Sequence, residues 1–266
     1  MSDQSMQVPQ VQSWDERLSP GRFESETVVV TGAGSGIGRA VALRVAHEGG
    51  HVVAADINGD RLNALVAEAP NGSVSPVVAD VSQAPDCAAI VAAANGRVDA
   101  LANVAGIMDD FTGIHDVSDA TWERVMRVNV SGVMMLTRAV IPMMLEAGRG
   151  RIVNVTSEAG LRGSAAGVTY TTSKHAVIGI TRSTAVLYGA DGIRTNAVAP
   201  GATITNIEAH PASQHSMERL GPYKAVNIGS AAQATQVGAT ICFLLSDDST
   251  NVNGVVLASD NGWNAV

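Results

Sequence analysis

Short apolar runs rich in β-branched residues alternate along the chain with longer, alanine-rich stretches in which apolar positions recur with helical spacing. The run Val28-Val29-Val30 is apolar at every position, which is typical of a strand buried on both faces of a parallel sheet. Such runs predict about seven strands, at 27–31, 51–56, 74–79, 98–102, 151–156, 194–198 and 254–258. Helical spacing predicts helices near 37–48, 59–68, 84–94, 121–147, 170–188 and 231–245.

This alternation predicts an α/β fold, a single doubly wound, Rossmann-type parallel sheet of about seven strands with helices on both faces. Residues 1–22 are polar, and we expect them to form a flexible tail ahead of one domain over 23–266. The segment 202–230 is rich in His, Ser, Asn, Pro and Gly without clear periodicity, and we expect it to form a mobile lid.

Composition excludes several classes of protein. Hydrophobic residues make up 46% and charged residues 16%, which excludes disordered and coiled-coil chains. The net charge is −8 and no basic run is present, so we expect no nucleic-acid partner. No apolar run approaches about 18 residues, and 1–22 lacks a secretory signal pattern, so we expect no membrane partner. Cys87 and Cys242 are far apart, which favours a reducing, cytoplasmic location without a disulfide.

A glycine-rich turn follows the first predicted strand and leads directly into a helix, as Thr31-Gly32-Ala33-Gly34-Ser35-Gly36-Ile37-Gly38. Its spacing fits T-G-x-x-x-G-x-G, and it lacks both G-x-G-x-x-G and the G-K-[ST] of a P-loop. Glycines let the backbone approach a pyrophosphate, and the helix start offers unpaired N–H groups to that anion. The turn therefore predicts a dinucleotide site, against the alternative of an ordinary strand-to-helix turn.

Asp56 ends the second predicted strand, eighteen residues after Gly38. In a dinucleotide-binding fold, a carboxylate at this place accepts hydrogen bonds from the adenosine ribose and repels a 2′-phosphate. Ser35, Ile57 and Asn58 supply no cation for that phosphate. The local sequence therefore favours NAD(H) over NADP(H), with an Asp that merely caps the next turn as the alternative.

Tyr170 and Lys174 stand four residues apart in a predicted helix, in a chain with only three Tyr. Positions i and i+4 share a helix face, so the phenol and the ammonium group can enter one pocket. A cation about 5 Å away would lower the pKa of a phenol from its usual value near 10. Ser157 precedes Tyr170 by thirteen residues, and Asn129 lies inside a predicted helix, where an Asn needs a specific partner.

From about residue 25 to the C-terminus, the chain resembles the short-chain dehydrogenase/reductase family. The resemblance rests on the order and spacing of the glycine turn, Asp80-Val81, Asn103-Val104-Ala105-Gly106, Asn129, Ser157, Tyr170-x-x-x-Lys174 and Pro200-Gly201. The segment N-V-A-G replaces the commoner N-N-A-G. The resemblance implies an NAD(H)-dependent oxidoreductase that interconverts a secondary alcohol and a ketone by hydride transfer.

The resemblance also assigns roles to residues. Tyr170 would be the general acid/base, Ser157 would hydrogen-bond the reacting oxygen, and Lys174 would hold the nicotinamide ribose and pass a proton outward near Asn129. The cofactor would contact Gly32, Ser35, Gly36, Ile37, Gly38, Asp56, Asp80, Val81, Asn103, Ala105, Gly106, Tyr170, Lys174, Pro200, Gly201, Ile204 and Thr205. A homotetramer is implied as well, with the helices at 121–147 and 170–188 packed across a two-fold axis.

Two alternatives stay open. An NADPH-dependent 3-oxoacyl-thioester reductase would use the same fold and catalytic residues, although Asp56 argues against it. A non-catalytic dinucleotide sensor would have no use for Ser157, Tyr170 and Lys174 together. No metal site is expected, because His210 and His215 lack further ligands. We expect substrate specificity to depend on 107–116, 158–168 and 202–227, with an apolar pocket near Met108, Phe111, Leu161, Met217 and Tyr223.

Overall fold

The computed structural model describes residues 14–228 and 230–265. Its main sheet has seven strands in the order β3-β2-β1-β4-β5-β6-β9, and every neighbouring pair is parallel. The strands are β1 (Thr27–Thr31), β2 (His51–Asp56), β3 (Val74–Val78), β4 (Ala100–Asn103), β5 (Gly150–Val155), β6 (Ile193–Pro200) and β9 (Val256–Ser259). The predicted doubly wound parallel sheet is confirmed.

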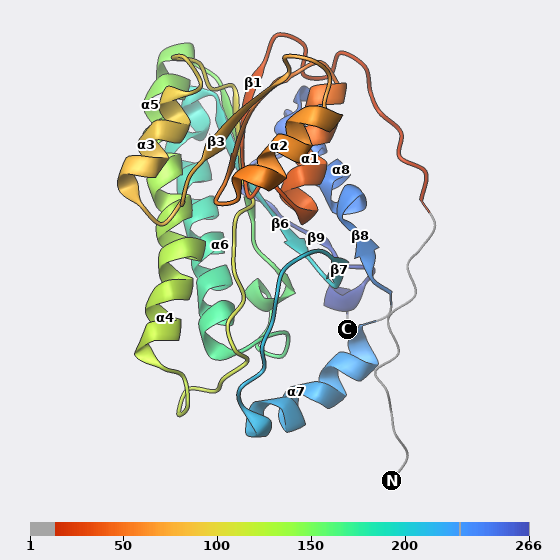
Figure 1. Ribbon diagram of the computed structural model, residues 1–266. Coiled ribbons are helices and arrows are strands. Elements are labelled where there is room, and N and C mark those ends of the chain that lie inside the picture. Colours follow the sequence, from red (N-terminus) through yellow and green to blue (C-terminus); the bar gives the residue numbers. More distant parts are fainter. Residues whose placement is uncertain (1–13, 229, 266) are drawn as a thin grey trace.

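Helices cover both faces of this sheet (Figure 1). One face carries α1 (Gly36–His47), α2 (Gly59–Glu68) and α8 (Ala234–Leu245). The opposite face carries α3 (Ala84–Ala92), α4 (Asp119–Met126), α5 (Val133–Ala147) and α6 (Val168–Tyr188). Two buried clusters fill these layers, and alternate residues of β1 divide between them: Val28 and Val30 face α1 and α8, and Val29 faces α3 and α5.

The helix predicted over 121–147 is interrupted. Residues Arg127–Gly132 form a π-helical turn between α4 and α5, and Asn129 lies within it. By length and composition alone, the stretch Asp119–Ala147 is long and apolar enough to cross a membrane. In this fold it packs on the sheet, with Leu136, Val140 and Met144 inside the second buried cluster.

The segment 202–230 contains regular structure that its sequence pattern did not predict. A short strand β7 (Thr203–Ile204) pairs with β8 (Ala232–Gln233), and α7 (Gln214–Asn227) lies between them in the chain. In Figure 1, α7 extends beyond the carboxyl end of the sheet. Its polar composition and the internal Pro222 explain why no helical apolar stripe was visible.

The polar N-terminal stretch is anchored in the part that the structure describes. Glu16 forms an ion pair with Arg44 of α1 at 2.7 Å, and the backbone N–H of Ser19 donates to Glu48 at 2.9 Å. Residues 1–13 of the expected tail lie outside the described residues.

Candidate active site

The predicted site residues gather at one edge of the sheet, because the carboxyl ends of parallel strands all lie there. The glycine turn follows β1, Asp56 ends β2, and Asp80 follows β3. Asn103 ends β4, and Ser157 comes just after β5. Residues from widely separated parts of the sequence thus share one edge.

The glycine turn is packed too closely for side chains. Gly32 and Gly36 have φ of +65° and +51°, values that L-residues with a Cβ rarely adopt. A Cβ on Gly38 would lie 2.2 Å from the carbonyl oxygen of Gly32. Ser35 precedes α1 without capping it by a side-chain hydrogen bond, and Ile37 packs against the core. This bare backbone at a helix start fits the pyrophosphate of a dinucleotide.

Asp56 is buried, and its carboxylate holds the glycine turn in place by a hydrogen bond. One oxygen accepts from the N–H of Gly34 at 2.9 Å, and the other accepts from the N–H of Asn58 at 2.9 Å. The carboxylate is therefore fixed beside the turn, at the position where an adenosine ribose would lie.

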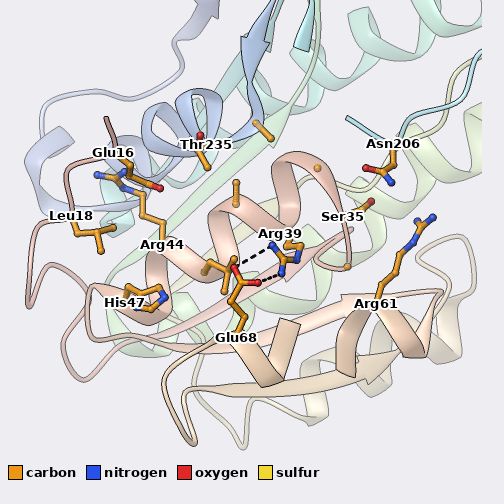
Figure 2. Close-up of a pocket in the computed structure, with 15 residues that line it drawn as sticks. Glu16, Leu18, Ser35, Arg39, Arg44, His47, Arg61, Glu68, Asn206 and Thr235 are labelled. Atoms are coloured by element: carbon orange, nitrogen blue, oxygen red, sulfur yellow. Dashed lines mark hydrogen bonds and ion pairs between the residues drawn. The ribbon is translucent and has the colours of Figure 1, made fainter. Parts of the chain in front are cut away.

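A hollow of about 640 Å³ adjoins the glycine turn, away from Tyr170. Figure 2 shows Arg61 of α2 reaching toward Ser35 and Asn206, and Arg39 of α1 pairing with Glu68. Guanidinium groups therefore line the hollow next to the glycine turn. The sequence reasoning missed them because it considered only the residues next to Asp56.

The loop after β4 is tied to the glycine turn. The hydroxyl of Thr31 accepts hydrogen bonds from the N–H groups of Val104 and Ala105, both at 3.0 Å. A Cβ on Gly32 would approach the Cα of Ala105 to 3.0 Å, so these two segments must stay together. Asn103 points elsewhere, because its amide donates to Asn154 at 2.8 Å inside the core.

The remaining expected cofactor residues frame the two ends of this edge. Asp80 accepts from the N–H of Ser82 at 2.8 Å, and Val81 packs against Gly132 of the π-helical turn. Pro200 ends β6, Gly201 lies against Asp260, and Ile204 is about half exposed on β7. Thr205 reaches the glycine turn, since a Cβ on Gly36 would lie 3.1 Å from the Cβ of Thr205.

Asn129 is buried in the π-helical turn, and its side chain has the specific partners that its position required. Its amide oxygen accepts from the N–H of Ile107 at 2.9 Å. Its amide nitrogen donates to the carbonyl of Ile107 at 3.0 Å and to the hydroxyl of Ser173 at 3.1 Å. Asn129 thereby joins the loop after β4 to α6.

Ser157, Tyr170 and Lys174 form one cluster. The hydroxyl of Ser157 hydrogen-bonds the Tyr170 phenol and also accepts from the N–H of Ala159 at 3.2 Å. The Lys174 Nζ lies 5.4 Å from the centre of the Tyr170 ring and donates to the carbonyl of Val155 at 2.9 Å. Both Tyr170 and Lys174 are buried on α6. A hydroxyl, a phenol and an ammonium group therefore converge.

The electrostatics of the cluster differ from the expectation that Lys174 lowers the phenol pKa. Burial raises the pKa of Tyr170 to about 12, the hydrogen bond from Ser157 opposes that shift, and the Asp109 carboxylate adds to it. Burial also lowers the pKa of Lys174 to about 8. Desolvation outweighs the attraction between the pair, so the phenol retains its proton at neutral pH.

Asp109 contacts α6, the helix that contains Tyr170 and Lys174, and was not predicted as a site residue. Its carboxylate is 3% exposed and accepts from the N–H of Tyr170 at 2.9 Å and from the N–H of Phe111 at 3.1 Å. It caps the first turn of α6 from a loop far away in the sequence. The only available signal was its place within 107–116, the segment expected to govern specificity.

Glu158 is also buried, directly after Ser157. Arg162 forms an ion pair with it at 2.9 Å, and the carboxyl of Asp260 hydrogen-bonds it. Burial raises the pKa of Glu158 to about 7, Asp260 adds to that shift, and Arg162 opposes it. The contact between Glu158 and Asp260 joins the end of β5 to the C-terminal segment. Among the described residues, no group of three metal-ligating side chains occurs, and His210 and His215 are not part of one.

The fold and the site together define a dinucleotide-binding oxidoreductase architecture with a Ser, Tyr and Lys cluster. The family model of short chain dehydrogenases matches residues 26–216. The chain belongs to this family of oxidoreductases, which act on CH–OH groups.

Curated relatives match along nearly their full length. The chain is 39% identical to 3beta-hydroxysteroid dehydrogenase 2 of Eggerthella lenta over 250 residues, 90% of this chain and 95% of the relative. It is 36% identical to a 3-oxoacyl-[acyl-carrier-protein] reductase of Thermotoga maritima over 249 residues, 91% of this chain and 98% of the relative.

Solved structures are similar to this chain over nearly its full length. A crystal structure of levodione reductase matches with a TM-score of 0.82 at 35% identity, covering 92% of this chain and all of that chain. A protein of Beutenbergia cavernae, assigned as an NAD(P)-dependent gluconate 5-dehydrogenase and holding NADP at low occupancy, matches with a TM-score of 0.80 at 34% identity. That match covers 93% of this chain and all of the other.

Proposed function

We propose that this protein is an NAD(H)-dependent oxidoreductase that interconverts a secondary alcohol and a ketone, with Tyr170 as general acid/base. The observation that carries the proposal is the cluster of Ser157, Tyr170 and Lys174 at the same sheet edge as a glycine turn whose Gly34 and Gly38 leave no room for a Cβ. A dinucleotide sensor would need the turn but not the cluster.

Each residue has a definite task in this reaction. A bound nicotinamide dinucleotide supplies the carbon that gives or takes the hydride. The phenol of Tyr170 keeps its proton at neutral pH, which is the form that donates to a carbonyl oxygen during reduction. Ser157 holds the same oxygen by its hydroxyl, and Lys174 stays fixed beside the phenol by its bond to Val155. In oxidation, the phenol must first lose its proton, and the proton of the alcohol then moves to the phenolate oxygen of Tyr170.

The cofactor contacts proposed here follow from the edge of the sheet. The glycine turn, with Ser35 and Ile37, would receive the pyrophosphate, and Asp56 would receive the adenosine ribose. Asp80 and Val81 would frame the adenine, and Ala105 and Gly106 would line the cofactor at the end of β4. Pro200, Gly201, Ile204 and Thr205 would cover the nicotinamide. Asn103 contributes by holding β4 to β5.

The choice of NAD(H) rests on Asp56, whose negative charge would repel a 2′-phosphate. Arg61 lies at the same end of the site and offers the opposite charge. It favours a second candidate function, an NADPH-dependent 3-oxoacyl-thioester reductase, which the similarity to the Thermotoga maritima reductase also supports.

A fluorescence titration with NADH and NADPH side by side tests this choice. We expect NADH to bind at least about tenfold more tightly, and Asp56→Asn to remove most of that preference. The control is Asp60→Asn, which removes a charge from the first turn of α2. Tighter binding of NADPH by the wild-type protein would overturn the NAD(H) assignment and favour the thioester reductase.

Two further features support proposals about the working state of the protein. Trp122, Met134 and Leu145 expose apolar side chains on the α4 and α5 face, and Val186 and Leu187 do so at the end of α6. These surfaces support a homotetramer, which sedimentation would test. Both cysteines are free and buried, which supports a reducing, cytoplasmic location.

A further inference from the structure

The side chain of Tyr170 belongs to an apolar cluster that segments distant in the sequence complete. Phe111, Ala159, Ala166 and Tyr170 form its buried part. Met217 and Leu220 of α7 pack against this part. Residues 217, 220 and 224 share one face of a helix, because three and four residues each make about one turn. Lys224 therefore lies on the face of α7 that turns toward Tyr170.

The ammonium group of Lys224 lies over the ring of Phe111, 3.9 Å from its centre. Lys224 is partly buried, and its burial lowers its pKa, while the Asp109 carboxylate opposes that shift. Within residues 14–228 and 230–265, its Nζ donates no hydrogen bond and forms no ion pair. The contact with the ring leaves its three N–H donors without acceptors from this part of the chain.

The neighbouring carboxylate does not satisfy this cation. Both oxygens of Asp109 accept backbone N–H groups, one from Tyr170 and one from Phe111, and Asp109 forms no ion pair with Lys224. An apolar substrate would leave a partly desolvated ammonium group without an acceptor, which is unfavourable. An anionic oxygen on the substrate would instead form a charge-assisted hydrogen bond in a poorly hydrated place.

We propose that Lys224 determines substrate specificity by binding a carboxylate on the substrate, at the end remote from the carbon that reacts beside Tyr170. This inference rests on the proposed function and adds the substrate class, an oxo acid or the matching hydroxy acid. The cation comes from α7 and the reacting groups from α6, so the substrate would bridge the two helices.

Steady-state kinetics with matched probes test the proposal. The probes are 4-oxopentanoate, 6-oxoheptanoate and 4-oxocyclohexanecarboxylate, each beside its methyl ester, with NADH and with NADPH. We expect wild-type kcat/KM for at least one acid to exceed that for its ester by about tenfold or more. In Lys224→Met this ratio falls to about one, mainly through a higher KM, and Lys224→Arg keeps most of it.

The design separates substrate binding from a merely structural contact. Met keeps the length of the side chain and can still contact the ring of Phe111, so a role limited to packing would survive in Lys224→Met. Arg219→Met removes a positive charge from the exposed face of the same helix and should leave the acid-to-ester ratio unchanged.

Four results would overturn the inference. If kcat/KM for each ester equals or exceeds that for its acid, at every spacing between ketone and carboxylate, the protein does not recognise a carboxylate on the substrate. An equal loss for acid and ester in Lys224→Met would reduce Lys224 to a packing contact. Turnover of esters without turnover of any acid would contradict the substrate class but leave the proposed oxidoreductase intact. No turnover of either series with either cofactor would count against the proposed function itself, and the inference would fall with it.

Discussion

The dinucleotide side and the substrate side of the active edge are built in different ways. The dinucleotide side consists of β1, β2 and the glycine turn, where backbone groups and a buried carboxylate fix each other at short distances. The substrate side joins the loop at 107–116, α7 and the C-terminal segment through a few side chains such as Asp109, Lys224 and Glu158. The first requires a nearly invariant backbone, whereas the second can change its lining without changing the fold.

Tyr170→Phe should have the largest effect and should separate chemistry from cofactor binding. Loss of the phenolic proton is expected to lower kcat by about 10²–10⁴-fold, because general acid/base catalysis is lost. The affinity for NADH should stay within about twofold, since most of the expected cofactor contacts come from other residues and Phe keeps the aromatic ring. Stopped-flow kinetics and fluorescence titration measure the two effects. Tyr188→Phe, at the end of the same helix, is the control, and retained turnover in Tyr170→Phe would remove the catalytic assignment.

Gly38→Ala should damage the dinucleotide side itself. Its new Cβ would lie 2.2 Å from the carbonyl of Gly32, so the turn must move. We expect cofactor affinity to fall at least about tenfold and the protein to lose about 1–3 kcal/mol of stability, because overpacking forces backbone shifts. Titration and thermal unfolding measure these losses. The control is Gly163→Ala, since no heavy atom outside its chain neighbours lies within 4 Å of that Cβ. Unchanged binding in Gly38→Ala would contradict the close-packed turn.

Asp109→Asn should disturb the substrate side and leave cofactor affinity alone. The Asn amide has only one oxygen, so it cannot accept from both backbone N–H groups as the two carboxylate oxygens do. The start of α6 therefore loosens, and we expect kcat to fall by about tenfold. Removing the anion also lowers the pKa of Tyr170, so the phenol should titrate at lower pH. The pH dependence of kcat records this shift, which a purely structural defect would not produce. Asp110→Asn, next in the chain and bonded to Thr121, is the control.

Glu158 should give the smallest effect, on stability against pH. Its pKa is raised from 4.5 to about 7 by burial first and by Asp260 second, so the folded chain holds a proton that the unfolded chain releases. The stabilisation is complete below about pH 4.5 and declines as pH rises through about 7. We expect the Tm to fall by several degrees over this window, and Glu158→Gln to remove that decline. If the Tm of Glu158→Gln still declines with rising pH, other groups cause the decline. The control is Glu146→Gln, a substitution at an exposed position.

The structure brings together the residues that local sequence predicted for the dinucleotide side. The glycine turn and the residue at the end of β2 are adjacent to their strands, so strand order alone brings them to one edge. The strand limits shifted only slightly, with β4 beginning at Ala100 rather than at 98. The pair Tyr170 and Lys174 was predictable because one helix face contains both.

The sequence by itself determined the parallel sheet, the glycine turn and the positions of the proposed catalytic groups, because each depends on short-range periodicity or on residues a few positions apart. The tertiary structure decided the protonation of those groups and their contacts with remote segments. Burial, and not the nearby cation, sets the protonation of Tyr170, and contacts between remote segments place Asp109 on its N–H and Lys224 over Phe111. Desolvation and long-range contacts depend on the whole packed chain, so no local pattern contains them.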